Sequence, residues 1–182
     1  LMIVMELASD GSLTDYLRTQ RRSARTKLFM CVGAAAGLTL IHSKGIIHCD
    51  VAARNCLYTD GVVKISDFGM ATKALSKQLE SGAKLPVKWM SPDALTDHFF
   101  TQKDDKCFFS HFSSMQNGNS CTAEMRGSVI LAAVTNGYWL EFPNDAPLKF
   151  VEFVMQHIWD PKRNNRYSMG AVYDWLKRQA EG

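Results

Sequence analysis

The sequence lacks paired cysteines. Its five cysteines, at positions 31, 49, 56, 107 and 121, form no Cys-x-x-Cys pair and have no metal-ligand spacing with the histidines. An odd number of cysteines outside a secretory context favours reduced, mostly buried thiols. The cysteine content therefore predicts an intracellular protein, which we expect in the cytoplasm.

Strong charge and long apolar runs are also absent. The chain carries 21 basic and 18 acidic residues, and a formal net charge of +3 is too small to indicate a nucleic acid or a membrane surface as the partner. Four arginines cluster in residues 18–25, and a solvated loop or helix end explains them more simply than a phosphate-binding patch. No apolar run reaches the length that spans a bilayer, and no basic leader precedes an apolar stretch. We therefore expect no nucleic acid partner and no membrane span.

The composition suits one folded domain. With 182 residues, 46% of them apolar, the chain can bury one sizeable core. The chain opens directly on an apolar run, residues 1–5, which reads as a buried strand. Such an opening is unusual and indicates a truncated sequence.

Two polar motifs carry the chemistry. Residues 48–55 read His-Cys-Asp-Val-Ala-Ala-Arg-Asn, and Asp67-Phe68-Gly69 begins twelve positions after Asn55. A carboxylate such as Asp50 can accept or orient the proton of a hydroxyl group. The side-chain oxygens of Asn55 and Asp67 suit Mg²⁺, which is a hard cation. Each residue alone fits a turn that bonds its own backbone, but the two motifs in this order and spacing favour the catalytic interpretation.

The two motifs resemble the catalytic loop and the metal-binding turn of protein kinases. In that family the loop reads His-Arg-Asp, then four residues and Asn, and the Ala-Ala-Arg before Asn55 resembles the tyrosine-kinase version. The resemblance implies a protein tyrosine kinase that transfers the γ-phosphate of ATP to tyrosines of protein substrates. It implies Asp50 as the base, Arg54 as its orienting partner, and Asn55 and Asp67 as metal ligands. The implied cofactors are ATP and Mg²⁺, with Mn²⁺ as the alternative metal.

A third motif is independent of the catalytic loop. Residues 86–93 read Pro-Val-Lys-Trp-Met-Ser-Pro-Asp and resemble the substrate-docking stretch of tyrosine kinases. By the family pattern, Asp93 pairs with Arg166, seven residues after Trp159. Residues 66–70 and 84–89 look most like the cytoplasmic Fes/Fer subfamily.

The resemblance also implies a nucleotide pocket at the start of the chain. Ser12 and Asp15 predict a capped helix over residues 13–17. In kinase terms Met5 would be the gatekeeper, the backbone of Glu6 and Ala8 would bind the adenine, and Ser12 would lie near the ribose. Leu57 would form the floor of the adenine pocket.

Periodicity and turn residues predict the remaining elements. They indicate helices over residues 26–43, 148–159 and 169–176, and a hairpin with strands at 56–58 and 62–65. The expected fold is α+β and mostly helical, that of a partial protein-kinase domain over 1–182 without its N-terminal lobe. Residues 1–11 would be the last small-lobe strand and the hinge, 12–176 the C-terminal large lobe, 46–69 the catalytic loop and metal-binding turn, and 67–93 the activation segment.

Several positions depart from the family pattern. Cys49 replaces the Arg of His-Arg-Asp, and residues 70–85 contain no tyrosine, so control by loop phosphorylation is expected to be absent. Cys49 can equally be read as a small buried residue. Residues 105–116 should form a central buried helix, yet Lys106 and His111 stand where apolar side chains are expected. A helix at this place could still let Asp105 brace the backbone near His48.

The sequence contains no glycine-rich phosphate loop, ATP-clamping lysine or partner glutamate of a small lobe. We therefore expect these 182 residues alone to be inactive. Regulatory domains outside the chain are expected. The alternative function is a pseudokinase or kinase-derived protein-interaction module.

Overall fold

A computed structural model describes residues 2, 4–19, 21–79, 87–109, 129, 132, 142, 146–160 and 162–182. The helices are α1 (Leu13–Thr19), α2 (Ala24–Ser43), α3 (Pro92–Asp97), α6 (Leu148–Phe153), the π-helical η4 (Val154–Ile158) and α7 (Met169–Glu181). Short 3₁₀ turns are η1 (Ala53–Asn55), η2 (Val87–Trp89), η3 (Asp105–Cys107) and η5 (Arg163–Asn165). The strands are β1 (Ile46–Ile47), β2 (Cys56–Thr59), β3 (Val62–Ile65), β4 (Thr72–Lys73), β5 (Ser76–Gln78) and β6 (Phe99–Thr101).

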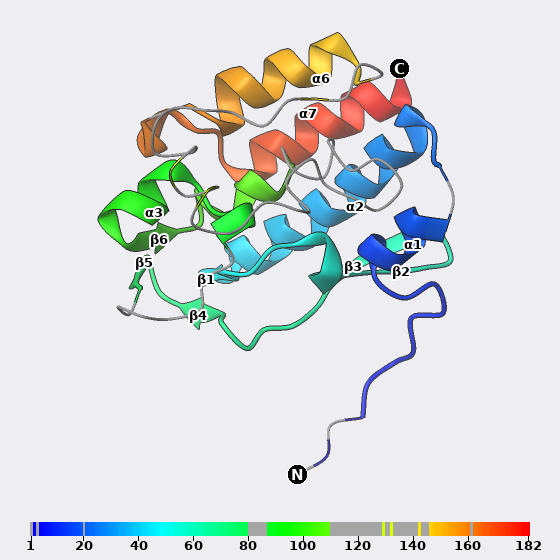
Figure 1. The fold of residues 1–182 in the computed structure, drawn as a ribbon, viewed down its shortest axis with the longest axis horizontal. Coiled ribbons are helices and arrows are strands. Elements are labelled where there is room, and N and C mark those ends of the chain that lie inside the picture. Colours follow the sequence, from blue (N-terminus) through cyan, green and yellow to red (C-terminus); the bar gives the residue numbers. More distant parts are fainter. Residues whose placement is uncertain are drawn as a thin grey trace.

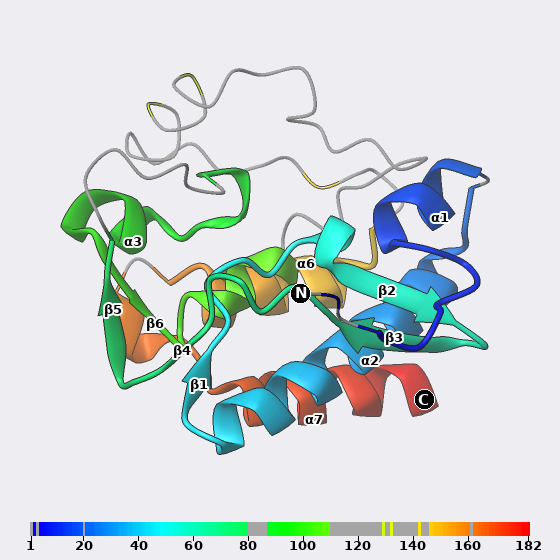
Figure 2. The ribbon, with the colours of Figure 1, turned by 90° about the horizontal axis from the view of Figure 1, so that it is seen from below.

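Helix α2 is the centre of the fold, and α7 packs along it (Figures 1 and 2). Ser23 caps α2, because its Oγ accepts a hydrogen bond from the N–H of Thr26 at 3.1 Å. The buried side chains of α2 include Met30 and Leu38, which belong to the main hydrophobic core. Among the described residues α2 is long and apolar enough to cross a membrane by length and composition alone. The expectation that no run reaches that length is therefore wrong, but here α2 is a core helix.

Two glycines let α2 approach the strand β3 closely. A Cβ atom on Gly33 would lie 3.1 Å from Cβ of Val63, and one on Gly37 would lie 2.9 Å from Cγ1 of Ile65. Real Cβ atoms essentially never lie as close as 2.9 Å, and 3.1 Å is tighter than nine in ten real contacts. A larger residue at either position would therefore require the neighbouring side chain or the strand to shift. The two glycines in the middle of this helix thus allow close packing.

The predicted hairpin is present. Strands β2 and β3 pair antiparallel, with Cys56 opposite Ile65 and Thr59 opposite Val62. The two connecting residues, Asp60 and Gly61, have φ angles of +50° and +78°. Two successive left-handed residues form the tight turn that matches the twist of antiparallel strands. The hairpin leads the chain directly from the catalytic loop to the Asp-Phe-Gly turn.

Two further antiparallel pairs hold the segment that follows this turn. Strand β4 pairs with β1, which precedes the catalytic loop, and β5 pairs with β6. Strands β4 and β5 therefore hold residues 67–79 against the rest of the domain, each through its pairing with another strand. The next residues, 80–86, lie outside the described part.

The expected buried strand at the start of the chain is wrong for its described residues. Met2, Val4 and Met5 are 87%, 89% and 73% exposed and belong to no strand. Figure 1 shows this segment running away from the body of the domain. A strand is stable only when its backbone groups pair with a neighbour, and no described residue pairs with this segment.

The predicted central helix is described only at its start. Asp105–Cys107 form a 3₁₀ turn, and Phe108 and Phe109 continue in helical conformation with fully buried side chains. Residues 110–128 lie outside the described residues, as do Gly137, Tyr138, Leu140 and Pro143 of the family pattern. Helix α6 with η4 covers most of the helix predicted over 148–159, and α7 extends the one predicted over 169–176.

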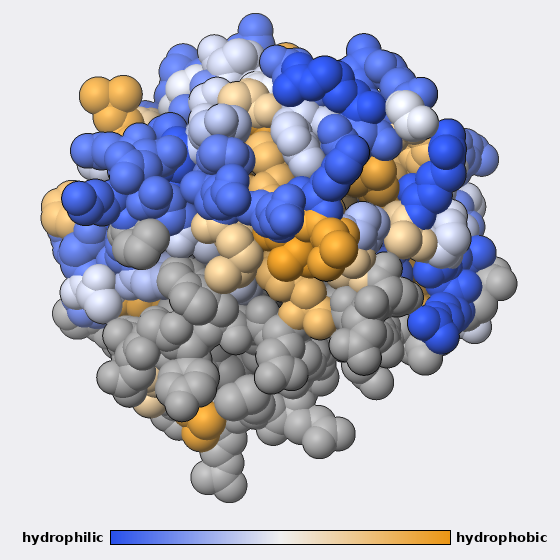
Figure 3. All heavy atoms as spheres, turned by 90° about the horizontal axis from the view of Figure 1, so that it is seen from above, coloured by the Kyte–Doolittle hydropathy of each residue, from blue (hydrophilic) through white to orange (hydrophobic). Residues whose placement is uncertain are grey.

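The surface on the side of α6 mixes polar and apolar residues (Figure 3). Leu148, the first residue of α6, is 79% exposed, and Met155 in the π-helical turn is 39% exposed. Two such single side chains are ordinary on a protein surface.

Candidate active site

The catalytic loop brings three of the predicted site residues together. Arg54 Nη2 lies 2.5 Å from Oδ1 of Asp50. The side-chain amide of Asn55 donates one hydrogen bond to Oδ2 of Asp50 and a second to its backbone carbonyl, both at 2.8 Å. The 3₁₀ turn Ala53–Asn55 makes this possible, because it leaves Arg54 exposed and turns Asn55 inward. Each carboxylate oxygen of Asp50 thus faces one side-chain donor.

The end of the hairpin ties this loop to the Asp-Phe-Gly turn. The backbone N–H and the hydroxyl of Ser66 both bond the carbonyl oxygen of Asn55, at 2.8 and 2.9 Å. The buried ring of His48 reaches the carbonyl oxygen of Ser66 at 3.0 Å. The residue before Asp67 is therefore fixed to both ends of the catalytic loop.

Asp67 itself lies at a sharp bend. Its φ angle is +60°, and its Oδ1 accepts a hydrogen bond from the N–H of Gly69 at 3.2 Å. The ring of Phe68 lies 5.1 Å from the ring of His48, measured between centroids. Because Asp67 is exposed, at least one of its carboxylate oxygens remains open to solvent. Aspartate adopts the left-handed region more readily than most residues.

Asp105 holds the backbone before the catalytic carboxylate. Its two carboxylate oxygens accept hydrogen bonds from the N–H groups of His48 and Cys49, each at 2.9 Å. Nε2 of His42 lies 2.8 Å from the oxygen that His48 uses. The expected bracing by Asp105 is therefore confirmed. The hydrogen bond from the Cys49 N–H to Asp105 holds the backbone of Cys49 at a φ of +66°, which is otherwise unfavourable for a residue with a side chain.

Cys49 is an inert thiol in this arrangement. It is 2% exposed, and its pKa is raised to about 12 by burial and by the nearby Asp105 carboxylate. Such a thiol stays protonated and is a poor nucleophile near neutral pH. The interpretation of Cys49 as a small buried residue is thus sufficient.

The available oxygens fit a hard cation. Both hydrogen bonds of the Asn55 amide use its nitrogen, so its carbonyl oxygen Oδ1 remains for a metal, together with the carboxylate of Asp67. Within the described residues, no three His, Cys, Asp or Glu side chains are grouped as a metal site. A site with one amide and one carboxylate ligand suits Mg²⁺, which keeps several waters and binds substrate phosphates.

The predicted nucleotide-side residues are only partly assembled. Ser12 and Leu57 are neighbours, because they form a β-bridge. Ser12 also caps α1, with its Oγ 2.6 Å from Asp15 Oδ2 and 3.2 Å from the Asp15 N–H. The side chain of Glu6 pairs with Lys64 at 2.6 Å, whereas the prediction concerns its backbone.

The two remaining nucleotide-side residues differ in exposure. Ala8 is half-buried, and its carbonyl accepts a hydrogen bond from Gly11 at 3.1 Å. Met5 is largely exposed. The printed contacts of this segment with β2 come from the residues that follow, because the Ser9 hydroxyl bonds that of Thr59 at 3.1 Å and the Asp10 N–H donates to the Tyr58 carbonyl oxygen at 3.3 Å.

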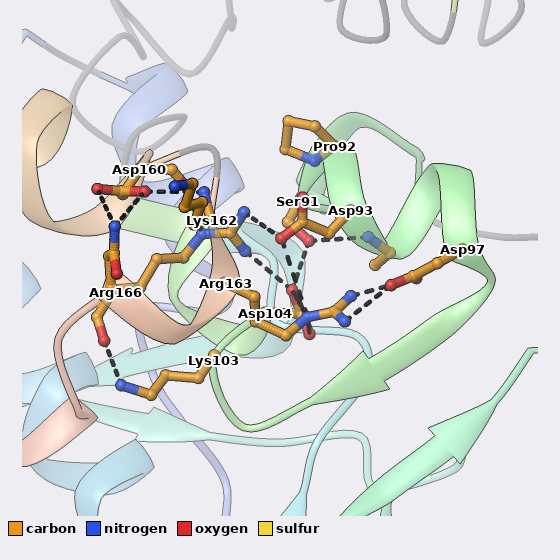
Figure 4. A network of polar contacts seen from close by, with 12 residues as sticks. Ser91, Pro92, Asp93, Asp97, Lys103, Asp104, Asp160, Lys162, Arg163 and Arg166 are labelled. Carbon is orange, nitrogen blue, oxygen red and sulfur yellow. Dashed lines mark hydrogen bonds and ion pairs between the residues drawn. The ribbon is translucent and has the colours of Figure 1, made fainter.

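Arg163 and Arg166 form an ion-pair network with three aspartates, Asp93, Asp97 and Asp104 (Figure 4). Arg166 Nη2 lies 2.8 Å from Asp93, which confirms the predicted pair. Arg166 also lies 3.0 Å from Asp104, and Arg163 bridges Asp104 to Asp97. The sequence analysis missed Asp104 and Arg163. Asp104 is fully buried and adjoins Asp105, so the network anchors the segment that braces the catalytic loop.

A lysine supports the segment after Asp67. Nζ of Lys77 in β5 donates to the carbonyl oxygen of Met70 at 2.7 Å. Residues 70–85 contain three hydroxyl side chains. Thr72 and Ser76 lie in β4 and β5, whereas Ser81 lies outside the described residues.

Comparison with known proteins gives consistent matches. The family model described as protein tyrosine and serine/threonine kinase matches residues 1–176. Megakaryocyte-associated tyrosine-protein kinase of Rattus norvegicus is 34% identical over 98% of this chain and 39% of its own length. Tyrosine-protein kinase transforming protein Fps of Fujinami sarcoma virus is 34% identical over 97% of this chain and 21% of its own length.

A third relative, tyrosine protein-kinase src-1 of Caenorhabditis elegans, is 30% identical over 96% of this chain and 35% of its own length. The chain therefore spans between 21% and 39% of the length of these three relatives.

Proposed function

Because the chain belongs to the protein tyrosine and serine/threonine kinase family, we propose that it is the large lobe of a protein tyrosine kinase domain. The proposed reaction is transfer of the ATP γ-phosphate to protein tyrosine. In this proposal residues 1–11 are the hinge side, 12–176 the large lobe, 46–69 the catalytic loop and metal-binding turn, and 67–93 the activation segment. The observation that carries it is the joining of Asp50, Arg54 and Asn55 to the turn at Asp67.

Asp50 is the proposed base. Its carboxylate would accept or orient the proton of the substrate phenol. Arg54 at 2.5 Å and the Asn55 amide at 2.8 Å fix the orientation of that carboxylate. Arg54 is exposed and so can contact an incoming tyrosine.

Asn55 and Asp67 are the proposed ligands of Mg²⁺ or Mn²⁺. When bound, the metal neutralises charge on the ATP phosphates. The hydrogen bonds of Ser66 to Asn55 keep the two ligands in one local structure. On the nucleotide side we assign Met5, Glu6, Ala8, Ser12 and Leu57, of which Ser12 and Leu57 already adjoin each other.

The proposed partners are proteins that present tyrosine acceptors. The relatives are several times longer than this chain, which supports regulatory domains outside it. Helix α2 is part of the core in this fold, and we propose neither a membrane span nor a nucleic acid partner. A cytoplasmic location is proposed from the cysteine content of the sequence.

Magnesium-dependent nucleotide binding tests whether the site is assembled. We expect a longer protein that contains this chain and a small lobe to bind a non-hydrolysable ATP analogue tightly only with Mg²⁺. Asp67→Asn should weaken that binding strongly, because it removes a negative ligand charge. Asp60→Asn in the exposed hairpin turn is the control and should bind like the wild type. Tight magnesium-independent binding, or an unaffected Asp67→Asn variant, would reject the metal ligand assignment.

The second candidate is a pseudokinase or protein-interaction module. It is favoured by Cys49 in place of an arginine and by Lys106 at a buried position of the expected central helix. A folded protein of this kind that binds no nucleotide would support the interaction module instead of the enzyme.

A further inference from the structure

A cavity of about 810 Å³ lies away from the catalytic loop, under the C-terminal end of α2. The segment after β4, the turn before η3 and the start of α7 form its other walls. Its basic lining residues are His42, Lys73, Lys103 and Lys106. None of the described residues that line the cavity is acidic. Apart from Gln102, whose side-chain amide donates to the carbonyl oxygens of His42 and Ile46, the remaining lining residues are small, apolar or hydroxyl-bearing, so the cavity combines apolar surface with positive charge.

Lys106 is the unusual residue of this cavity. Its side chain is fully buried, and its Nζ makes no hydrogen bond within the part of the chain that the structure describes. A buried ammonium group without a partner is costly, since it has lost its water and gained nothing in return. Burial, and next the charge of Lys103, lower the pKa of Lys106 to about 7.

The neighbouring groups do not supply the missing partner. Lys103 and Arg166 are cations, and Nζ of Lys103 donates to the carbonyl oxygen of Arg166. Asp104 attracts Lys106, but its carboxylate is already engaged by Arg166, Arg163, Ser91 and Thr101. Cys107 is a buried thiol whose pKa is raised to about 12, so it remains neutral. Among the described residues, the charges near Lys106 that are not already paired are therefore positive, and an anion would complement them.

We propose that this cavity binds a small organic anion, in which a carboxylate or phosphate group pairs with Lys106 and an apolar body fills the cavity. The anionic group supplies the hydrogen-bond acceptor that Lys106 lacks, and Lys103 and Lys73 add positive charge at the same cavity. The volume is that of an ordinary small-molecule site. Binding takes up a proton, because only the protonated lysine pairs with the anion.

The test uses three probes with the same six-carbon body on the full-length protein. Hexanoate carries a carboxylate, hexyl sulfate carries a tetrahedral oxyanion that represents phosphate, and 1-hexanol carries no charge. Neither anion changes charge between pH 6 and 8.5. A change in affinity over this range therefore reflects a change in the protonation of the protein. Melting temperature against probe concentration gives the affinity.

We expect saturable stabilisation by at least one anion and none by hexanol at equal concentration. With a pKa of about 7, the protonated fraction of Lys106 predicts roughly 30-fold tighter binding at pH 6 than at pH 8.5. Lys106→Met should lose the saturable response, whereas exposed Lys162→Met should keep it. The stronger of the two anions identifies the head group.

Three results would overturn the proposal: equal effects of hexanol and both anions, retained anion binding in Lys106→Met, or affinity independent of pH. Lys106→Met replaces an unpaired ammonium by an apolar side chain of similar length, so its own melting temperature should equal or exceed that of the wild type. That measurement verifies that a lost response does not reflect misfolding.

Discussion

Asn55 donates both of its amide hydrogens to Asp50, one to the carboxylate and one to the backbone carbonyl, each over 2.8 Å. One side chain thus fixes both the position of the catalytic loop and the orientation of its carboxylate. Both of these hydrogen bonds use the amide nitrogen, so the side-chain carbonyl oxygen of Asn55 takes part in neither and remains for the proposed metal. In the proposed mechanism, one amide group therefore both positions the base and binds the metal.

Asn55→Asp should destabilise the fold in a pH-dependent way. The substitution places two carboxylates about 3 Å apart, so one of them must bind a proton to restore the hydrogen bond. The native pKa of the pair is then raised, and the folded variant binds more protons than the unfolded chain near neutral pH. Its unfolding free energy should be lower than that of the wild type by roughly 2 kcal/mol at pH 8 and recover as the pH falls towards 5. Urea unfolding at both pH values measures this.

Asn165→Asp is the matched control. Asn165 also donates to both oxygens of an aspartate, Asp160, but at 3.3 Å and on the surface. We expect a loss below about 0.5 kcal/mol at either pH. An equal loss in both variants would show that the arrangement at Asp50 has no special role in stability.

Arg166→Met should be strongly destabilising. The arginine is 1% exposed and pairs with both Asp93 and Asp104, and Asp104 is fully buried. Removing the guanidinium leaves a buried carboxylate short of its partner, which costs roughly 3 kcal/mol or more. Lys177→Met breaks the exposed pair with Glu181 and should cost less than about 1 kcal/mol. Chemical denaturation of the two variants compares them, and similar losses would contradict the buried-network interpretation.

Lys106→Met should change how stability depends on pH. In the wild type, the unfolded lysine keeps its proton up to about pH 10.5, whereas the folded one loses it near 7. The unfolded state therefore binds more protons between these values, and the Lys106 contribution makes the wild type more stable as pH rises. The unfolding free energy of Lys106→Met should exceed that of the wild type most at pH 6. This difference should shrink by roughly 3 kcal/mol towards pH 9.5.

The difference in unfolding free energy between the wild type and Lys106→Met measures the contribution of Lys106 alone. Above about pH 9 the buried thiols Cys49, Cys56 and Cys107, whose pKa is raised to about 12, lower the stability of both proteins equally. Unfolding free energies measured at matched pH values remove this common term. A constant difference between wild type and variant across the range would show that Lys106 stays protonated in the fold.

Local signals in the sequence predicted local structure well. The hairpin follows from Asp60 and Gly61, and the starts of α1 and α7 follow Ser12 and Ser168, whose side chains cap the helices. In the site, the motif spacing predicted Asp50, Arg54 and Asn55 as one cluster.

Long-range pairing was harder to predict. Asp104 carries no motif, and its role arises only because Arg163 and Arg166 reach it from about sixty residues away. The strand expected over residues 1–5 was inferred from apolar composition, which cannot specify the neighbouring strand that a buried strand requires. The sequence placed a lysine, Lys106, where the family pattern has a buried apolar residue, and so indicated that this lysine is buried. It gave no sign of the cavity that Lys106 lines.

Transfer of labelled γ-phosphate to a tyrosine peptide is the most direct test of the proposed kinase activity. The protein assayed contains residues 1–182 and a small lobe, and the peptide is compared with its phenylalanine and serine counterparts. We predict magnesium-dependent labelling of the tyrosine peptide alone, and at least a roughly 100-fold loss of rate in Asp50→Asn. Wild-type turnover in that variant would contradict the role of Asp50. No transfer by a folded wild-type protein that binds Mg²⁺ and ATP would contradict the enzyme and favour the interaction module.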